Sequence, residues 1–406
     1  MSDTSCLPTA TPESVGLSDR QLRQVMDVLS GEVEAGRIPG TVFGIARHGK
    51  LAWLEAVGFR DKDTGDAMRT DAIFPLASMT KPIVSVAAMI LVERGKLFLA
   101  DPVAEYLPQF ADMQVAVEAR DSRTGAARTV LEPASSAITV QDLLRHTAGM
   151  VNAGLLPLTT VRQRYLDAGV TDLDQTLEER IDKLSQMPLA HHPGTAWEYS
   201  MAVDVTGRLI EVVSGMPLDR FVAAHVTGPL KMADTGYYVP EQHWRRIAQP
   251  MVDPITGQLP RHQDPRHPPK LVGGNTGMVA TAADYLRFCQ MMLNGGALDD
   301  VRILGAGTIA HMSSDHLGSI SQDGEVARWL LVPGHGFGLG FAVRLAAGEH
   351  PMPGSVGDYH WGGAFGTLFL IDPKRNLVAV AMINQANFME RHMRLFRTLV
   401  HQTLAE

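Results

Sequence analysis

Ser78 and Lys81 stand three residues apart, directly before a long apolar run. Side chains at this spacing lie on the same face of a helix, so the Lys81 amine can reach the Ser78 hydroxyl. A serine becomes a strong nucleophile when a neighbour removes its proton, and a desolvated lysine can do this. The start of a helix also favours a developing alkoxide. The alternative interpretation is that Ser78 caps the helix and Lys81 points into solvent.

Tyr199 is a second candidate, in the segment Trp197-Glu198-Tyr199-Ser200 after a turn at residues 192–194. A tyrosine presented from a loop between helices could hydrogen-bond Ser78 and Lys81 and transfer a proton. The structural alternative is a partly buried aromatic side chain at the start of a helix.

A third candidate is the glycine-rich segment 359–366, which contains Trp361, Gly362, Gly363 and Ala364. Glycines inside a strand weaken its packing and often mark a close approach of the backbone to a ligand. Such a strand can offer an N–H group to an oxyanion. A bulged strand without a ligand is the alternative.

Hydrophobic periodicity predicts the elements that must position these residues. It predicts helices over residues 18–38, 83–92, 140–145, 177–186, 202–214 and 389–404. It predicts strands over residues 41–46, 51–59, 337–345, 366–371 and 377–384. Strands near both ends with helices between them indicate an α+β fold with one antiparallel sheet flanked by helices.

The predicted sheet domain is discontinuous and comprises residues 1–75 and 271–406. A mostly helical domain, residues 76–270, is inserted into it. Ser78 then lies at the first crossover, Tyr199 in the insertion and Trp361 on the returning sheet. This organisation places the candidate site in the cleft between the two domains.

Composition excludes several classes of protein. The 406 residues include 45% hydrophobic and 20% charged residues, which is a globular balance. Lys and Arg number 36 against 44 Asp and Glu, and no basic stripe with aromatic residues supports nucleic-acid binding. Two cysteines, Cys6 and Cys289, cannot form a disulfide framework. The sequence begins without a signal-peptide pattern and has no membrane-spanning run, so we expect a cytoplasmic protein.

Other motifs fail on inspection, and no cofactor is expected. Gly-x-Ser-x-Gly is absent, which weighs against an α/β-hydrolase. His262 and His267 have the wrong spacing for a zinc-binding helix, and His191-His192 fits a polar loop better than a metal site. The alternating glycines at 334–340 lack the strand-turn-helix of a dinucleotide loop and fit one face of a strand. No feature specifies an oligomeric state.

The order and spacing of the three candidate segments resemble the serine β-lactamase and penicillin-binding-protein superfamily. Within it the chain looks most similar to the family VIII carboxylesterases, and the resemblance covers about residues 15–400. The segments that carry it are Phe74 to Pro82 with Ser78 and Lys81, His146-Thr147-Ala148-Gly149-Met150, Trp197-Glu198-Tyr199-Ser200, Gly273-Gly274 with Gly277-Met278, and Trp361-Gly362-Gly363.

The resemblance implies a role for each matched residue. Ser78 is the acylated nucleophile, and Lys81 and Tyr199 form the acid/base pair, with the identity of the base left open. The backbone amides of Ser78 and Ala364 form the oxyanion hole. Trp361, with Gly362 and Gly363, borders the acyl site. The implied fold is β-lactamase-like.

Two departures from the β-lactamase pattern favour an ester as the small-molecule substrate. Met201 stands where β-lactamases have an asparagine, and Trp361-Gly362-Gly363 replaces their Lys-Thr-Gly. The second change removes a cation that would bind a substrate carboxylate. We therefore expect an esterase for short- to medium-chain acyl groups. The alternatives are an acyltransferase, a β-lactamase or D-amino-acid peptidase-type amide hydrolase, and a non-catalytic binding module.

Overall fold

An eight-stranded sheet runs through the computed structural model, which describes residues 6–120, 123, 126–155, 157–252, 257–259, 262–386 and 389–405. Its strand order is β10-β11-β12-β13-β14-β1-β2-β3, and every neighbouring pair is antiparallel. The strands are β1 (Gly40–Arg47), β2 (Lys50–Asp61), β3 (Asp66–Ala67), β10 (His335–Phe337), β11 (Ala342–Arg344), β12 (Tyr359–Gly362), β13 (Leu368–Asp372) and β14 (Leu377–Ile383).

The two ends of the chain meet in the middle of this sheet. Strand β1 pairs with β14 from Thr41 opposite Ile383 to Arg47 opposite Leu377. Strands β1 and β2 form the expected hairpin. The predicted α+β fold, with one antiparallel sheet built from both ends of the chain, is confirmed.

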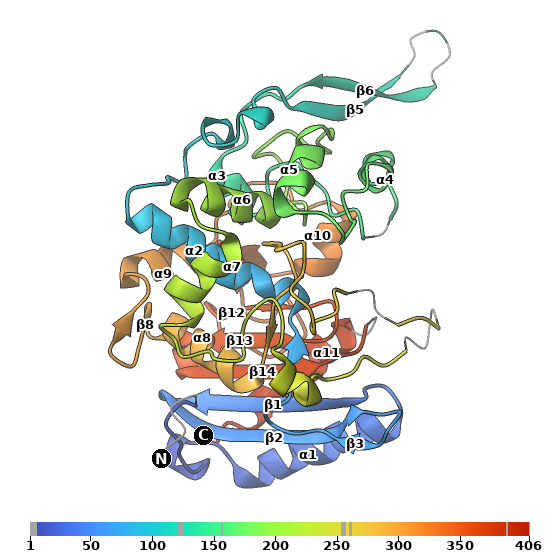
Figure 1. The fold of residues 1–406 in the computed structure, drawn as a ribbon. Helices are drawn as coiled ribbons and strands as arrows, with labels where there is room; N and C mark the ends of the chain where they lie inside the picture. The colour runs from blue at the N-terminus through green and yellow to red at the C-terminus, as the bar shows by residue number, and fades with distance from the viewer. Residues whose placement is uncertain are drawn as a thin grey trace.

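Helices cover both faces of the sheet (Figure 1). Alternate side chains of a strand point to opposite faces, so Phe43 packs with α1 (Asp19–Glu34) and α11 (Met389–Gln402). Its neighbour Val42 belongs to the larger core on the other face, which contains α8 (Ala282–Leu293) and α2 (Thr80–Glu93). Every residue of α2 from Thr80 to Leu91 is buried, which agrees with the buried helix expected from the apolar run at 83–92 that only Ser85 interrupts.

The region between the sheet strands is mostly helical and lies above the sheet in Figure 1. Its helices are α3 (Val140–Leu144), α4 (Thr160–Asp167), α5 (Leu177–Ser185), α6 (Ala202–Ser214) and α7 (Leu218–Val222). Further along the chain lie α9 (Ala306–Met312) and α10 (Glu325–Leu330). Short strand pairs are β4 (Phe74–Pro75) with β7 (Val279–Ala280), and β8 (Ala297–Leu298) with β9 (Val301–Arg302).

Several elements differ from the prediction, which did not include α4, α7, α8, α9 and α10. The hairpin of β5 (Gln114–Arg120) and β6 (Ala127–Pro133) was not expected in the helical region. The strand predicted over 337–345 is wrong, because β10 and β11 are separate strands of a hairpin. The chain turns where Gly340 has φ 110°, and a Cβ there would lie 2.5 Å from the Ser85 hydroxyl oxygen. Apolar periodicity cannot show such a turn, since its glycine serves a close tertiary contact.

In the described ranges, no helix is both long and apolar enough to cross a membrane.

Glu32 joins the two helices that cover the outer face of the sheet. It is 4% exposed and receives hydrogen bonds from Arg37 at 2.8 Å and Arg391 at 3.0 Å. The hydrogen bond from Arg37, with that from Arg391, lowers the pKa of Glu32 to about 2. The ionised carboxylate therefore contributes stability above its ordinary pKa, and this is lost as the pH falls.

We expect Glu32→Gln to unfold at a lower urea concentration at neutral pH. As the pH falls from 4.5, the ordinary pKa of a glutamate, to about 2, the parent protein should lose more stability than the variant. Urea unfolding across this pH range measures both effects, and Glu34→Gln on the exposed side of the same helix is the control. Parallel pH profiles for parent and Glu32→Gln would contradict the assignment.

Candidate active site

Ser78 lies on a sharp turn between β4 and α2. The turn is a short 3₁₀ segment, Ala77–Met79, and Ala77 has φ 45°. A non-glycine residue in this left-handed region costs about 1–3 kcal/mol, so the surrounding structure must hold it there. The Leu76 amide donates to the Met278 carbonyl at 2.8 Å, which fixes the start of the turn. The Ser78 side chain lines a cavity.

Lys81 follows one turn later and is 1% exposed. Its Nζ donates to the Ser78 Oγ at 3.0 Å and to the Asn275 carbonyl at 2.9 Å. The same Nζ lies 4.6 Å from the centroid of the Tyr199 ring, within the range of a cation–π interaction. The structure thus places the amine against the serine hydroxyl, rather than in solvent.

Tyr199 reaches the same serine from the segment before α6. Its hydroxyl donates to the Ser78 Oγ at 2.7 Å, and the residue is 5% exposed. The ring packs against His146 at 4.7 Å and against Trp361 at 5.4 Å between centroids. Ser78, Lys81 and Tyr199 therefore form one hydrogen-bonded cluster, although 121 positions separate the serine from the tyrosine.

His146 supports the tyrosine from behind. It is fully buried, and its burial, followed by the charge of Lys81, lowers its pKa well below the ordinary value. The ring is therefore neutral. The Ser200 amide donates to His146 Nδ1 at 3.4 Å, so the proton resides on Nε2. His146, the first residue of the segment His146-Thr147-Ala148-Gly149-Met150, therefore packs against Tyr199.

The end of β12 lies against the turn that carries Ser78. A Cβ on Gly363 would come within 2.3 Å of the Leu76 carbonyl oxygen, so only glycine allows this approach. Gly362 lies directly before it, at the end of the strand. Among the described residues, the amides of Ser78 and Ala364 have no hydrogen-bond acceptor. Both amides are therefore available to a bound oxygen atom.

A cavity of about 500 Å³ opens at these residues. Ser78, Tyr199, Trp361, Gly362 and Ala364 all contribute to its wall. No lysine or arginine is among the described residues that line it. The lining is thus mainly apolar, with the serine hydroxyl and the tyrosine hydroxyl as its reactive groups.

Sequence reasoning missed the residues that hold Lys81. The Asn275 carbonyl accepts from Lys81, and the Asn275 amide donates to Asp204 at 2.8 Å. Asp204 forms a 3.0 Å ion pair with Arg180, and both side chains are at most 2% exposed. One signal was available, because Asp204 stands on the buried face of an amphipathic helix and an acid there needs a partner.

The histidines at 262 and 267 that were considered from the sequence both pack against aromatic rings. His262 packs on Phe365, and His267 packs on Trp244. Among the described residues, the one group with metal-binding spacing is His335, Asp358 and His360. Arg344 and Arg397 both pair with Asp358 there, at 3.2 and 2.8 Å. Two guanidinium groups repel a metal cation, so this group does not suit one.

Three comparisons identify relatives of the chain. An uncharacterised protein of Mycobacterium tuberculosis is 34% identical over 362 residues, 86% of each chain. Esterase EstB of Burkholderia gladioli is 30% identical over 400 residues, 92% of this chain and 93% of its own. The structure of EstCE1, described as a hydrolase with promiscuous acyltransferase activity, has a TM-score of 0.77 at 28% identity. The match covers 94% of this chain and 99% of the EstCE1 chain.

The Beta-lactamase family matches residues 19–402 of the chain. Both this match and the esterase relative agree with the resemblance drawn from the motifs. The chain therefore belongs to the β-lactamase family, within the superfamily of serine β-lactamases and penicillin-binding proteins.

Proposed function

We propose that the protein is a serine carboxylesterase of the family VIII type that hydrolyses short- to medium-chain acyl esters through an acyl-enzyme on Ser78. The observation that carries this proposal is the pair of hydrogen bonds at the Ser78 Oγ, from Lys81 at 3.0 Å and Tyr199 at 2.7 Å. The homologous esterase and the hydrolase neighbour support an ester hydrolase.

The first half-reaction forms the acyl-enzyme. The Ser78 Oγ attacks the ester carbonyl carbon, while its proton passes to the Lys81–Tyr199 pair. The tetrahedral intermediate then collapses, the carbon–oxygen bond to the alcohol breaks, and the pair returns the proton to the leaving alcohol. Water repeats the sequence in the second half-reaction and releases the acid.

The backbone amides of Ser78 and Ala364 stabilise the negative oxygen of both tetrahedral intermediates. Their N–H groups have no acceptor among the described residues, so no internal hydrogen bond has to break. Preorganised donors of this kind contribute about 3–4 kcal/mol each to the lowering of the barrier.

The lining of the cavity favours an ester over a β-lactam. β-Lactam antibiotics carry a carboxylate, which a cationic side chain can bind. The described lining has no lysine or arginine, and Trp361 stands where the Lys-Thr-Gly motif of β-lactamases has its lysine. An uncharged acyl group packed on Trp361 fits these walls.

Replacement of the nucleophile tests the proposal. We expect Ser78→Ala to lower kcat for a 4-nitrophenyl ester by at least about 10⁴-fold, because the variant lacks the nucleophile that carries the acyl group. The matched control is Ser85→Ala, which removes a buried hydroxyl from the same helix. A phosphonate label followed by mass spectrometry should modify Ser78 alone.

Full turnover by Ser78→Ala would refute the mechanism. An unlabelled Ser78 in the parent protein would favour the non-catalytic binding module. Nitrocefin hydrolysed as fast as the ester would favour the amide hydrolase.

Removal of one hydroxyl tests the acid/base pair. Tyr199→Phe keeps the ring that packs on His146 and Trp361 but loses the hydrogen bond to Ser78. We expect kcat to fall by about 10²–10⁴-fold with little change in the unfolding midpoint, as for the loss of a general acid/base. Tyr106→Phe, which removes a hydroxyl paired with Asp101, is the control. Unchanged kcat in Tyr199→Phe would remove the tyrosine from proton transfer.

Acyl transfer is the second candidate, because the EstCE1 neighbour is described as having promiscuous acyltransferase activity. An acyl-enzyme that hydrolyses esters can also pass its acyl group to an alcohol. We expect added methanol to yield methyl ester in competition with the free acid, measured by chromatography of the products. Free acid alone, at every methanol concentration, would limit the protein to hydrolysis.

A further inference from the structure

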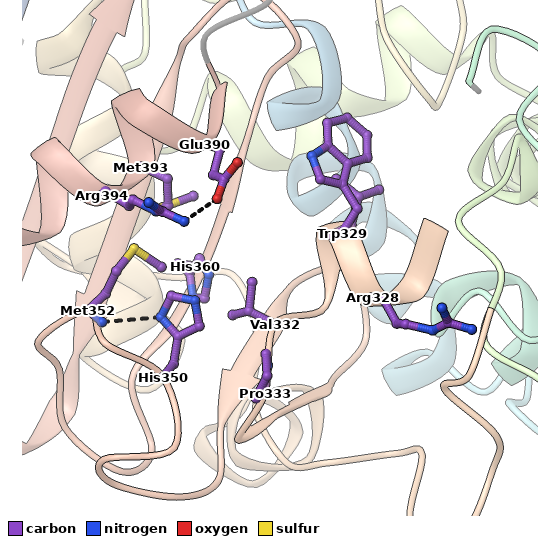
Figure 2. Close-up of a pocket in the computed structure, with 11 residues that line it drawn as sticks. Arg328, Trp329, Val332, Pro333, His350, Met352, His360, Glu390, Met393 and Arg394 are labelled. Carbon is purple, nitrogen blue, oxygen red and sulfur yellow. Dashed lines mark hydrogen bonds and ion pairs between the residues drawn. The ribbon is translucent and has the colours of Figure 1, made fainter. Parts of the chain in front are cut away.

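A second cavity of about 230 Å³ continues from the active-site cavity. We call it the side chamber. It shares Trp329, Leu330, His360, Glu390 and Met393 with the active-site cavity, so the two spaces are contiguous. Figure 2 shows its walls, in which His350 and His360 lie opposite Val332 and Pro333.

The side chamber lies on the α11 side of the sheet. Adjacent residues of a strand point to opposite faces, so Trp361 faces Tyr199 while His360 faces Arg397 of α11. In the described chain β11 pairs with β12 only at Tyr359 and His360. The pairing therefore ends before Trp361, and the active-site cavity extends from Ser78 to His360, where it meets the side chamber.

His360 presents a defined hydrogen-bond donor there. The Arg397 Nη2 lies 2.7 Å from His360 Nδ1, and a guanidinium can only donate, so Nδ1 carries no proton. Burial, followed by the charge of Arg397, lowers the pKa of His360 well below its ordinary value. The neutral ring must then hold its proton on Nε2. The residue is 5% exposed, and its Nε2 has no partner among the described residues.

His350 repeats this arrangement on the same wall. The Met352 amide donates to His350 Nδ1 at 3.2 Å, and burial lowers the pKa of this histidine too. Its proton therefore also lies on Nε2. Two imidazoles thus line one chamber, each with its Nδ1 occupied by a donor and its Nε2 carrying the proton.

The charges behind this wall favour an acceptor. Arg344, Arg397 and Asp358 are at most 2% exposed and together carry two positive charges and one negative charge. The described lining itself adds Arg328 and the ion pair of Arg394 with Glu390, so positive charge remains in excess and attracts the negative end of a carbonyl dipole.

Resting on the esterase function, we propose that the side chamber is a subsite for the far end of the acyl chain, where His360 Nε2–H donates to an oxygen atom of the substrate. The substrate class is esters of acids that carry a carbonyl group near the end of the chain. His360 is thus a specificity-determining residue that takes no part in the chemistry at Ser78.

Matched ester pairs test this subsite. The 4-nitrophenyl esters of hexanoic, octanoic and decanoic acid are compared with those that carry a ketone on the last carbon but one. We expect kcat/KM to favour the oxo ester by about 3- to 10-fold in at least one pair, the effect of one hydrogen bond. The ratio should fall to about one in His360→Phe. It should remain in His311→Phe, an exposed histidine that lines neither cavity.

Val332→Trp provides a second variant that leaves the histidines in place. Val332 lines the side chamber but not the active-site cavity, and the indole would fill the side chamber. The ratio of kcat/KM for the oxo ester to that for the plain ester should again fall to about one. If His360→Phe does not fold, Val332→Trp alone tests the subsite. A ratio near one in every pair of the parent protein, or a ratio that persists in Val332→Trp, would overturn the subsite. If the esterase function holds, the parent protein hydrolyses 4-nitrophenyl acetate. Hydrolysis of this ester together with no preference for the oxo esters would contradict the subsite and leave the esterase function intact.

Discussion

The burial of the Lys81 amine is the constraint on which the site depends. An amine that is 1% exposed at the start of an apolar helix loses nearly all of its hydration. The Ser78 Oγ, the Asn275 carbonyl and the face of the Tyr199 ring replace the lost water. Each of these three groups comes from a different part of the chain. The lysine can therefore be accommodated only when the whole fold has formed.

A second layer of buried charges fixes these neighbours. Asp204 orients Asn275 by accepting its amide hydrogen, and Arg180 balances the charge of Asp204. On the other side, the residue before Tyr199, Glu198, pairs with Arg162, and both are at most 6% exposed. Breaking a buried pair by removing one partner is strongly destabilising, so these pairs hold the segments that present Asn275 and Tyr199.

Much of this arrangement could be predicted from the sequence, because it rests on side chains with characteristic spacing. Helical periodicity is enough to place Lys81 beside Ser78. The apolar runs at both ends of the chain gave the antiparallel sheet. The carbonyl of Asn275 could not be predicted, since every residue has a carbonyl and its direction depends on tertiary contacts. The side chamber was hidden for a similar reason, because residues near 330, 350, 360 and 390 come together only through the fold.

The turn at Ser78 is held independently of the walls that surround the substrate. Its strained residue, Ala77, lies between two anchored neighbours. The Leu76 carbonyl accepts from Thr367 Oγ1 at 3.1 Å, and the Met79 carbonyl accepts from the Tyr285 hydroxyl at 2.9 Å. These anchors belong to the segment before β13 and to α8, neither of which lines the active-site cavity or the side chamber.

The walls of the side chamber come instead from α10, the loops near residues 332 and 350, and α11. A substitution in these walls therefore leaves in place the hydrogen bonds from Thr367 and Tyr285 that hold the turn at Ser78. Strand β12 borders both the reacting serine and the side chamber. Trp361 and Gly362 at its end line the cavity at Ser78, and His360 lines the side chamber. One strand can border both because consecutive side chains point to opposite sides.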